Sequence, residues 1–131
     1  MKRLKLRVSA ICIICLSIIM TSICFANELS FNRKFVDSNQ YTTIGSATKS
    51  ANGTYGEIKV QTIYNANLVD SGYQQVYAKV LNGSAVLITR GSWYTVPIPS
   101  AYQHAGSNVL LKCKGHNPAL DCYITGYWNV H

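Results

Sequence analysis

The alternation of residues near the C-terminus constrains the fold more than any other feature of this sequence. Five residues that suit a protein interior fall on one side of an extended chain: Cys122, Ile124, Gly126, Trp128 and Val130. The residues between them fall on the other side: Tyr123, Thr125, Tyr127 and Asn129. Because successive side chains of a β-strand point to opposite faces, the last nine residues before His131 predict a half-buried strand. We assign Trp128 to its core face.

Further short strands are expected along the chain, separated by turn residues roughly every 8 to 12 positions. The expected ranges are 41–49, 55–64, 73–81, 85–89, 93–96 and 109–112, with an edge strand or arm near Phe31 and Phe35. Asn52-Gly53 favours a tight turn with positive φ, and Asn82-Gly83 closes the clearest hairpin. No window shows helical periodicity. The pattern predicts an all-β fold, a small antiparallel β-sandwich, with a small β-barrel as the alternative.

The first 26 residues have the layout of a signal peptide. Four cations lie within residues 1–7, and residues 8–25 carry no charge. Small side chains at Cys24 and Ala26 predict cleavage after Ala26, which leaves residues 27–131 as a single secreted β domain. An uncleaved membrane anchor is the alternative. Lipid attachment at Cys24 is disfavoured because the bulky Ile23 precedes it.

Two cysteines remain once the leader is removed. Because export places them in an oxidising compartment, Cys113 and Cys122 are expected to form one disulfide. The bridge would cross-link the loop between two strands and stabilise the fold by roughly 2.5 to 3 kcal/mol. The alternative is a pair of buried free thiols.

The charge left after cleavage is small. Four of the 12 basic residues lie in the leader, so eight remain against five acidic residues, a formal charge of +3. This balance requires no nucleic acid partner, although it suits an anionic membrane or wall polymer. The local basic pairs are Arg33 with Lys34 and Lys112 with Lys114.

The sequence contains no recognisable catalytic or metal-binding motif. No Ser, His and Asp stand in the context of a hydrolase, so we predict no enzyme and no cofactor. His104, His116 and His131 with Asp121 have suitable side chains for zinc, but their spacing matches no metal site. We expect these histidines to be solvated.

Aromatic residues are the best candidates for binding. Tyr123 and Tyr127 share the polar face of the last predicted strand, and Trp93 and Tyr94 lie beside a break in the pattern. Exposed rings of this kind stack on sugars or settle at a membrane interface. The alternative is that they only cover neighbouring strands.

The Gly126-Tyr127-Trp128 ending, the leader and the Thr/Ser-rich opening of the mature part resemble an uncharacterised family of small secreted proteins of Gram-positive bacteria. That resemblance implies a compartment and a fold but no site residues. The chain also resembles, more distantly, secreted bacteriocins with β-rich mature parts. We therefore expect a secreted, non-enzymatic module that binds a glycan or another envelope component. A secreted antimicrobial, membrane-active protein is the alternative.

Overall fold

The computed structural model describes residues 27–116 and 120–130. The predicted signal peptide, residues 1–26, and His131 lie outside the described residues. Within the described part no helix is long and apolar enough to cross a membrane.

The described chain forms eight strands and one short 3-10 helix. Strand positions agree closely with the sequence prediction, because alternation and turn residues are local signals. The elements are β1 (Asn27–Val36), β2 (Thr42–Thr48), β3 (Tyr55–Tyr64), β4 (Gln75–Val80), β5 (Val86–Thr89), β6 (Trp93–Pro97), η1 (Ser100–Tyr102), β7 (Asn108–Gly115) and β8 (Cys122–Val130).

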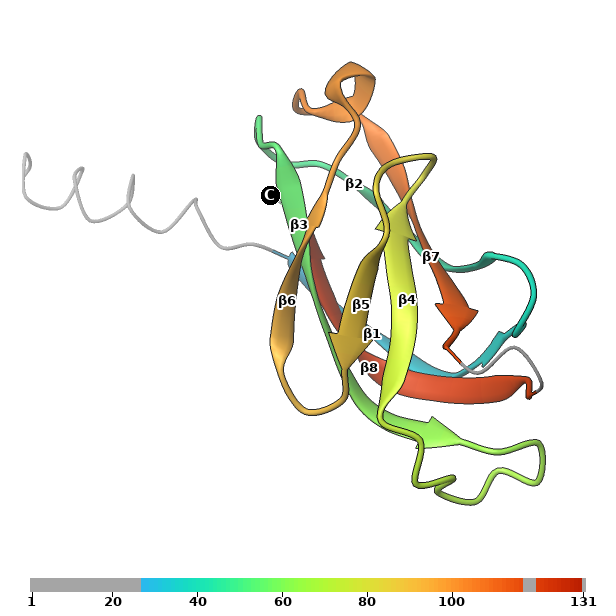
Figure 1. The fold of residues 1–131 in the computed structure, drawn as a ribbon. Coiled ribbons are helices and arrows are strands. Elements are labelled where there is room, and N and C mark those ends of the chain that lie inside the picture. Colours follow the sequence, from blue (N-terminus) through green and yellow to red (C-terminus); the bar gives the residue numbers. More distant parts are fainter. Residues whose placement is uncertain (1–26, 117–119, 131) are drawn as a thin grey trace, which may run out of the picture.

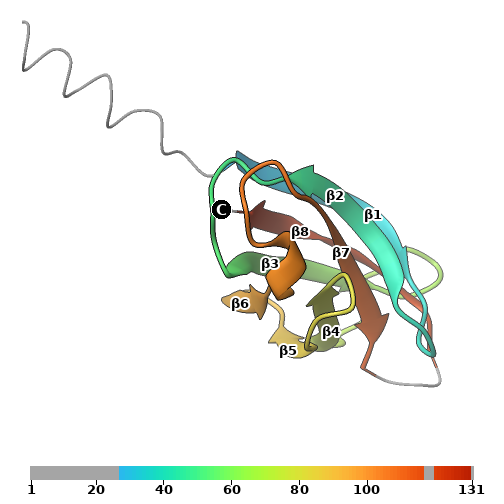
Figure 2. The ribbon, with the colours of Figure 1, turned by 90° about the horizontal axis from the view of Figure 1, so that it is seen from above.

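The strands form two antiparallel sheets of four strands each, in the orders β1-β8-β3-β6 and β2-β7-β4-β5 (Figure 1). The all-β prediction is confirmed. In the second view, β6 of one sheet lies near β5 of the other, and β1 lies near β2 (Figure 2). No hydrogen-bonded ladder joins the two sheets in the described chain, so the alternative of a closed barrel is wrong.

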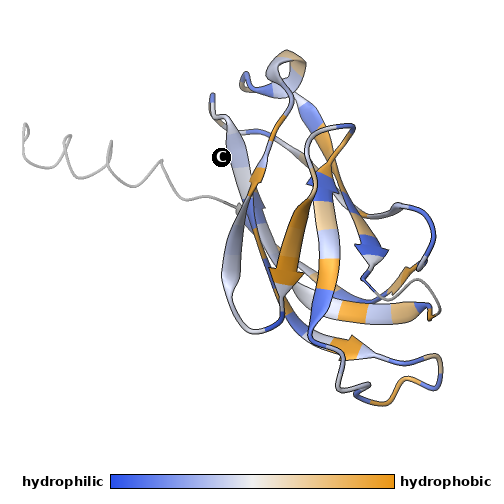
Figure 3. Cartoon of the chain, viewed as in Figure 1, coloured by the Kyte–Doolittle hydropathy of each residue, from blue (hydrophilic) through white to orange (hydrophobic). Residues whose placement is uncertain are grey.

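The core lies between the inner faces of the two sheets. Apolar and polar residues alternate along most strands (Figure 3). In β8, as predicted, every second residue from Cys122 to Val130 is buried, and Trp128 is only 3% exposed. The β4–β5 hairpin is also confirmed.

Two β-bulges bend the first sheet around the middle of β8. β1 shifts its register between Phe31 and Lys34, and β3 shifts between Val60 and Thr62. Both shifts lie beside Gly126, whose strand neighbours are Phe31 and Val60. Bulges insert unpaired residues and increase local twist, so they curve this sheet over the core.

The two strands that carry the cysteines, β7 with Cys113 and β8 with Cys122, belong to different sheets. β7 pairs with β2 and β4, whereas β8 pairs with β1 and β3. The predicted disulfide is a further point of difference, because Cys113 and Cys122 are both buried free thiols. The prediction treated the two strands as one cross-linked unit, whereas each strand pairs within its own sheet and both thiols are free.

The expected tight turn at Asn52-Gly53 is also wrong. Gly53 does not have a positive φ, and its N–H donates to the carbonyl oxygen of Gln103 at 2.8 Å. The segment carries the chain from β2 in one sheet to β3 in the other. An Asn-Gly pair favours a hairpin only where the flanking strands are neighbours.

Candidate functional site

The outer face of the β1-β8-β3-β6 sheet carries a group of aromatic side chains from all four strands. We call it the aromatic face and define it by five residues: Phe35, Tyr64, Trp93, Tyr123 and Tyr127. Trp93 is 43% exposed and Phe35 is 42% exposed, and the three tyrosines are partly exposed. Large rings at this exposure leave part of their apolar surface available to a ligand.

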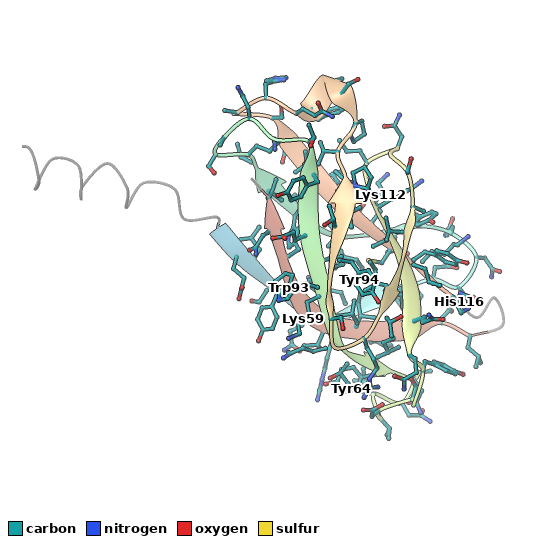
Figure 4. The ribbon with its side chains drawn as sticks, turned by 60° about the vertical axis from the view of Figure 1, so that its left-hand side comes forward. Lys59, Tyr64, Trp93, Tyr94, Lys112 and His116 are labelled. Carbon is teal, nitrogen blue, oxygen red and sulfur yellow. The ribbon has the colours of Figure 1, made fainter. Side chains whose placement is uncertain are left out.

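The first row of the aromatic face crosses three strands. Lys59 in β3 is the backbone partner of Tyr127 in β8 on one side and of Trp93 in β6 on the other. Directly opposed residues have Cβ atoms about 5 Å apart, so the lysine lies between two rings. Figure 4 shows Trp93 and Lys59 close together on one side of the molecule.

The second row lies nearer the start of β8. Tyr123 is the backbone partner of Phe35 in β1 and of Tyr64 in β3. The rings of Phe35 and Tyr123 meet edge to face, with centroids 5.6 Å apart. The guanidinium carbon of Arg33 lies 5.5 Å from the centroid of the Tyr64 ring. This row therefore combines apolar ring surface with a cation.

Thr125 lies between the two rows and supports the bulge in β1. Its hydroxyl accepts a hydrogen bond from the Arg33 N–H at 3.0 Å and donates to Asn32 Oδ1 at 3.1 Å. Arg33 adopts a positive φ of 47°, which a residue other than glycine seldom does. The threonine side chain thus satisfies backbone that the bulge removes from the ladder.

The structure brings together three of the four aromatic residues selected from the sequence. Tyr123, Tyr127 and Trp93 share the aromatic face, whereas Tyr94 pairs with the buried Ile58 and packs against the core. Neighbouring residues of a strand point to opposite faces, so Trp93 and Tyr94 cannot share one.

Sequence reasoning missed Phe35 and Tyr64, and it missed Lys59 between Trp93 and Tyr127. Strict alternation would place Phe35 on the buried face with Phe31, and Tyr64 on the buried face with Val60. The bulges reverse both assignments. Lys59 alternates with the buried Ile58 and Val60, and this alternation was the signal that could have placed it in the site.

A cleft of about 200 Å³ lies at the end of the molecule near Tyr73, Gln75, His116 and Cys122. Burial, and then the neighbouring Asp121, raises the pKa of Cys122 to about 11. A thiol at such a pKa is almost entirely protonated at neutral pH, and the thiolate is the nucleophile. The His116 ring packs against Tyr77, with centroids 5.4 Å apart. The cleft offers no activated Cys-His pair.

Two of the three histidines lie in the described part of the chain. His104 is exposed in the loop after η1, and His116 is exposed just after β7. Among residues 27–116 and 120–130, no three His, Cys, Asp or Glu side chains gather closely enough to hold a metal ion. Within this part of the chain, the aromatic face is the strongest candidate site.

Comparison of the chain with protein-family models, curated proteins and solved structures gave no match.

Proposed function

We propose that the protein is a secreted, non-enzymatic module that binds a glycan of the cell envelope on its aromatic face. The observation that carries this proposal is the set of five rings in two cross-strand rows on one outer sheet face. The C–H faces of sugars are apolar while their edges carry hydroxyls. A face that alternates rings with polar side chains matches both.

The polar residues of the aromatic face fit the same ligand. Lys59 lies between Trp93 and Tyr127, and Thr125 lies between the two rows. The Lys59 ammonium donates to sugar hydroxyls, and the Thr125 oxygen, whose own proton goes to Asn32, has one lone pair left to accept from them. The face is an open sheet surface, so it suits several units of a polymer better than a single small molecule.

Secretion is part of the proposal and rests on the leader in residues 1–26. The protein recovered from the culture medium is then expected to begin at Asn27. An N-terminus at Met1 in a membrane fraction would favour a retained anchor instead.

The glycan proposal is tested by comparing Trp93→Ala and Tyr127→Ala with Tyr102→Ala. Tyr102 is a matched control because it is 39% exposed on η1, outside the aromatic face. We expect each of the first two variants to weaken binding to isolated cell-wall polysaccharide about tenfold, the effect of losing about 1.4 kcal/mol of stacking. Tyr102→Ala should bind like the wild type. Sedimentation with insoluble wall, followed by quantification of unbound protein, measures this.

Two outcomes would contradict the proposal. The wild-type protein could fail to bind any wall polysaccharide, or all three variants could bind equally well. Thermal unfolding of each variant shows whether the fold is intact. Because both rings of interest are partly exposed, their removal should change stability little.

A membrane-active protein is the second candidate, favoured by apolar side chains at one end of the molecule. Leu68 and Val69 are 40% and 60% exposed in the loop between β3 and β4. This loop contains an apolar segment (Figure 3). Leu120 is also exposed and shares a cleft with residues 65–67 of the same loop. Such a tip suits insertion into the surface of a bilayer.

Vesicle leakage separates the two candidates. A membrane-active protein should release dye from anionic vesicles, and Val69→Asn should reduce that release while wall binding is unchanged. A glycan-binding module should bind wall and release no dye. The Trp93→Ala variant then distinguishes the two surfaces, because it should affect wall binding alone.

A further inference from the structure

The β2-β7-β4-β5 sheet has an unusual distribution of charge. Its four strands contain no Asp or Glu, and their only charged residues are Lys79, Lys112 and Lys114. The five acidic residues of the described chain lie in the other sheet or in loops: Glu28, Glu57, Asp37, Asp70 and Asp121. One sheet is therefore exclusively basic although the net charge of the domain is small.

The three lysines lie together on the outer face of this sheet. Lys79 in β4 is the backbone partner of Lys112 in β7, and Lys114 is two residues further along β7. Residues separated by two positions in a strand are about 6.6 Å apart, and neighbouring strands are about 4.8 Å apart. Lys112 belongs to the other sheet from Trp93 and Lys59, and Figure 4 shows it apart from them. This surface is therefore separate from the aromatic face.

Two tyrosines hold the ammonium groups in place. Lys79 Nζ lies 4.1 Å from the centroid of the Tyr41 ring, and Lys114 Nζ lies 5.2 Å from the same centroid. Lys114 Nζ also lies 5.6 Å from the Tyr77 ring. Cation–π contacts restrict these long side chains without neutralising their charge. Lys79 and Lys114 are therefore partly ordered before any ligand arrives.

Among the described residues, no ion pair joins these three lysines to a carboxylate. The Asp37 carboxylate accepts hydrogen bonds from the backbone N–H groups of Asn39 and Gln40. Asp121 accepts a hydrogen bond from the Ser38 N–H at 2.9 Å. Opposed like charges destabilise a sheet, and Lys79 faces Lys112 directly. Three like charges gathered on one sheet face at a cost in stability point to a role in binding an anion.

The chemistry of the face selects among anionic partners. None of the large exposed hydrophobic side chains of the described chain lies on these four strands, which disfavours insertion into a membrane. The rings of Tyr41 and Tyr77 are occupied by lysines, which disfavours stacking on nucleic acid bases. A hydrophilic chain with regularly spaced anions remains. Lys112 and Lys114 lie in line along β7, as a linear chain requires.

We propose that the outer face of the β2-β7-β4-β5 sheet binds a linear polyol-phosphate polymer through Lys79, Lys112 and Lys114. The phosphodiester groups contact the ammonium groups, and the polyol carbons lie over the tyrosine edges. This proposal does not depend on the glycan proposal, because it involves the other sheet and a charged ligand. A protein with both surfaces could hold two envelope polymers at once.

The test measures binding to poly(glycerol phosphate) as a function of salt concentration. The variants are Lys112→Gln with Lys114→Gln, and as a control Lys34→Gln, which removes an exposed lysine from β1 in the other sheet. We expect the double variant to bind at least tenfold more weakly in low salt. The slope of log affinity against log salt should fall by roughly one for each lysine removed. The control should differ little from the wild type.

Thermal unfolding of the double variant excludes misfolding as the cause of a loss, because both substituted lysines are only partly buried and Gln keeps most of their volume. Three results would overturn the proposal. They are no binding by the wild type, equal loss of binding by Lys34→Gln, and tighter lysine-dependent binding to oligo(dT) or to phosphatidylglycerol vesicles. The last would identify nucleic acid or membrane as the partner of this face. Binding to neutral wall polysaccharide, measured in parallel, should not change in the double variant.

Discussion

Gly126 shows how one residue can be required by packing. Its position is on the buried face of β8, where the Phe31 ring and the Lys59 carbonyl oxygen occupy the space that a side chain would need. The adjacent Tyr127 and Trp128 then point to opposite faces of the strand. Gly126, Tyr127 and Trp128 therefore have three different roles: close approach of the backbone, a ring on the aromatic face and core volume.

We expect Gly126→Ala to destabilise the protein by about 2 kcal/mol or more, since the added methyl group collides with backbone and ring atoms. Gly45→Ala is the matched control. A methyl group at Gly45 would meet only Trp128 Nε1, at an ordinary 3.6 Å. Urea unfolding of both variants measures the difference. Equal stability of the two would contradict the packing described around Gly126.

At the scale of elements, an ion pair between Arg90 and Asp70 ties the loop between β3 and β4 to the end of β5. Arg90, which follows β5, donates from both terminal nitrogens to the Asp70 carboxylate, at 2.8 and 3.1 Å. Asp70 also forms an isolated bridge with Tyr64, and its carboxylate accepts a hydrogen bond from the Gly72 N–H. The hydrogen bond from Arg90, followed by that from Gly72, lowers the pKa of Asp70 from 3.8 to about 2.

This lowered pKa predicts a specific acid dependence. An Asp whose pKa is lower in the folded state adds stability above its unfolded pKa, and that stability is lost as the pH falls from about 4 to about 2. We expect Arg90→Gln to lower the melting temperature slightly at pH 7. Between pH 4 and pH 2, the melting temperature of this variant should fall less steeply than that of the wild type. The effect should be small because the pair is partly exposed.

Arg33→Gln is the control for this pair. It removes an equal charge from a position that contacts the Tyr64 ring. Its melting temperature should fall with acid as steeply as that of the wild type. Parallel acid profiles for Arg90→Gln and the wild type would show that the ion pair contributes nothing to stability.

At the scale of the whole molecule, no disulfide joins the two sheets in the described chain. They are held by one shared core, to which both cysteines contribute buried side chains. Burial, and then the charge of Cys122, raises the pKa of Cys113, and burial and Asp121 raise that of Cys122 to about 11. Both thiols are therefore neutral core residues at physiological pH.

Three measurements follow from free buried thiols. A reductant should not change the melting temperature, and a thiol reagent should detect two thiols per unfolded chain but react slowly with the folded protein. Stability should also fall as the pH rises from about 9 toward 11. The folded state keeps protons that the unfolded thiols release in that range. Failure to detect thiols in the unfolded, unreduced protein would restore the predicted disulfide.

Two outer faces of different chemistry are also a property of the whole molecule. The aromatic face belongs to β1-β8-β3-β6, and the three lysines belong to β2-β7-β4-β5. Because the chain changes sheet at most connections, neighbouring strands in the sequence contribute to opposite faces. Composition alone gives only a mildly basic, tyrosine-rich domain and conceals this division.

The sequence by itself determined where the strands lie and which way most of their residues point. Alternation in β8, and in β3 as far as Val60, is a local property of extended backbone, so it can be read without knowledge of any partner strand. The same signal correctly placed Trp128 in the core and Tyr127 outside it.

Only the tertiary structure decided which strands are neighbours. β1 pairs with β8, from the opposite end of the described chain, and β7 and β8 lie in different sheets. These pairings place Phe35 and Tyr64 beside Tyr123, create the bulges that turn them outward, and leave Cys113 and Cys122 as free thiols. The physical reason is that alternation has a period of two within one strand, whereas pairing and register are set by burial across the whole core.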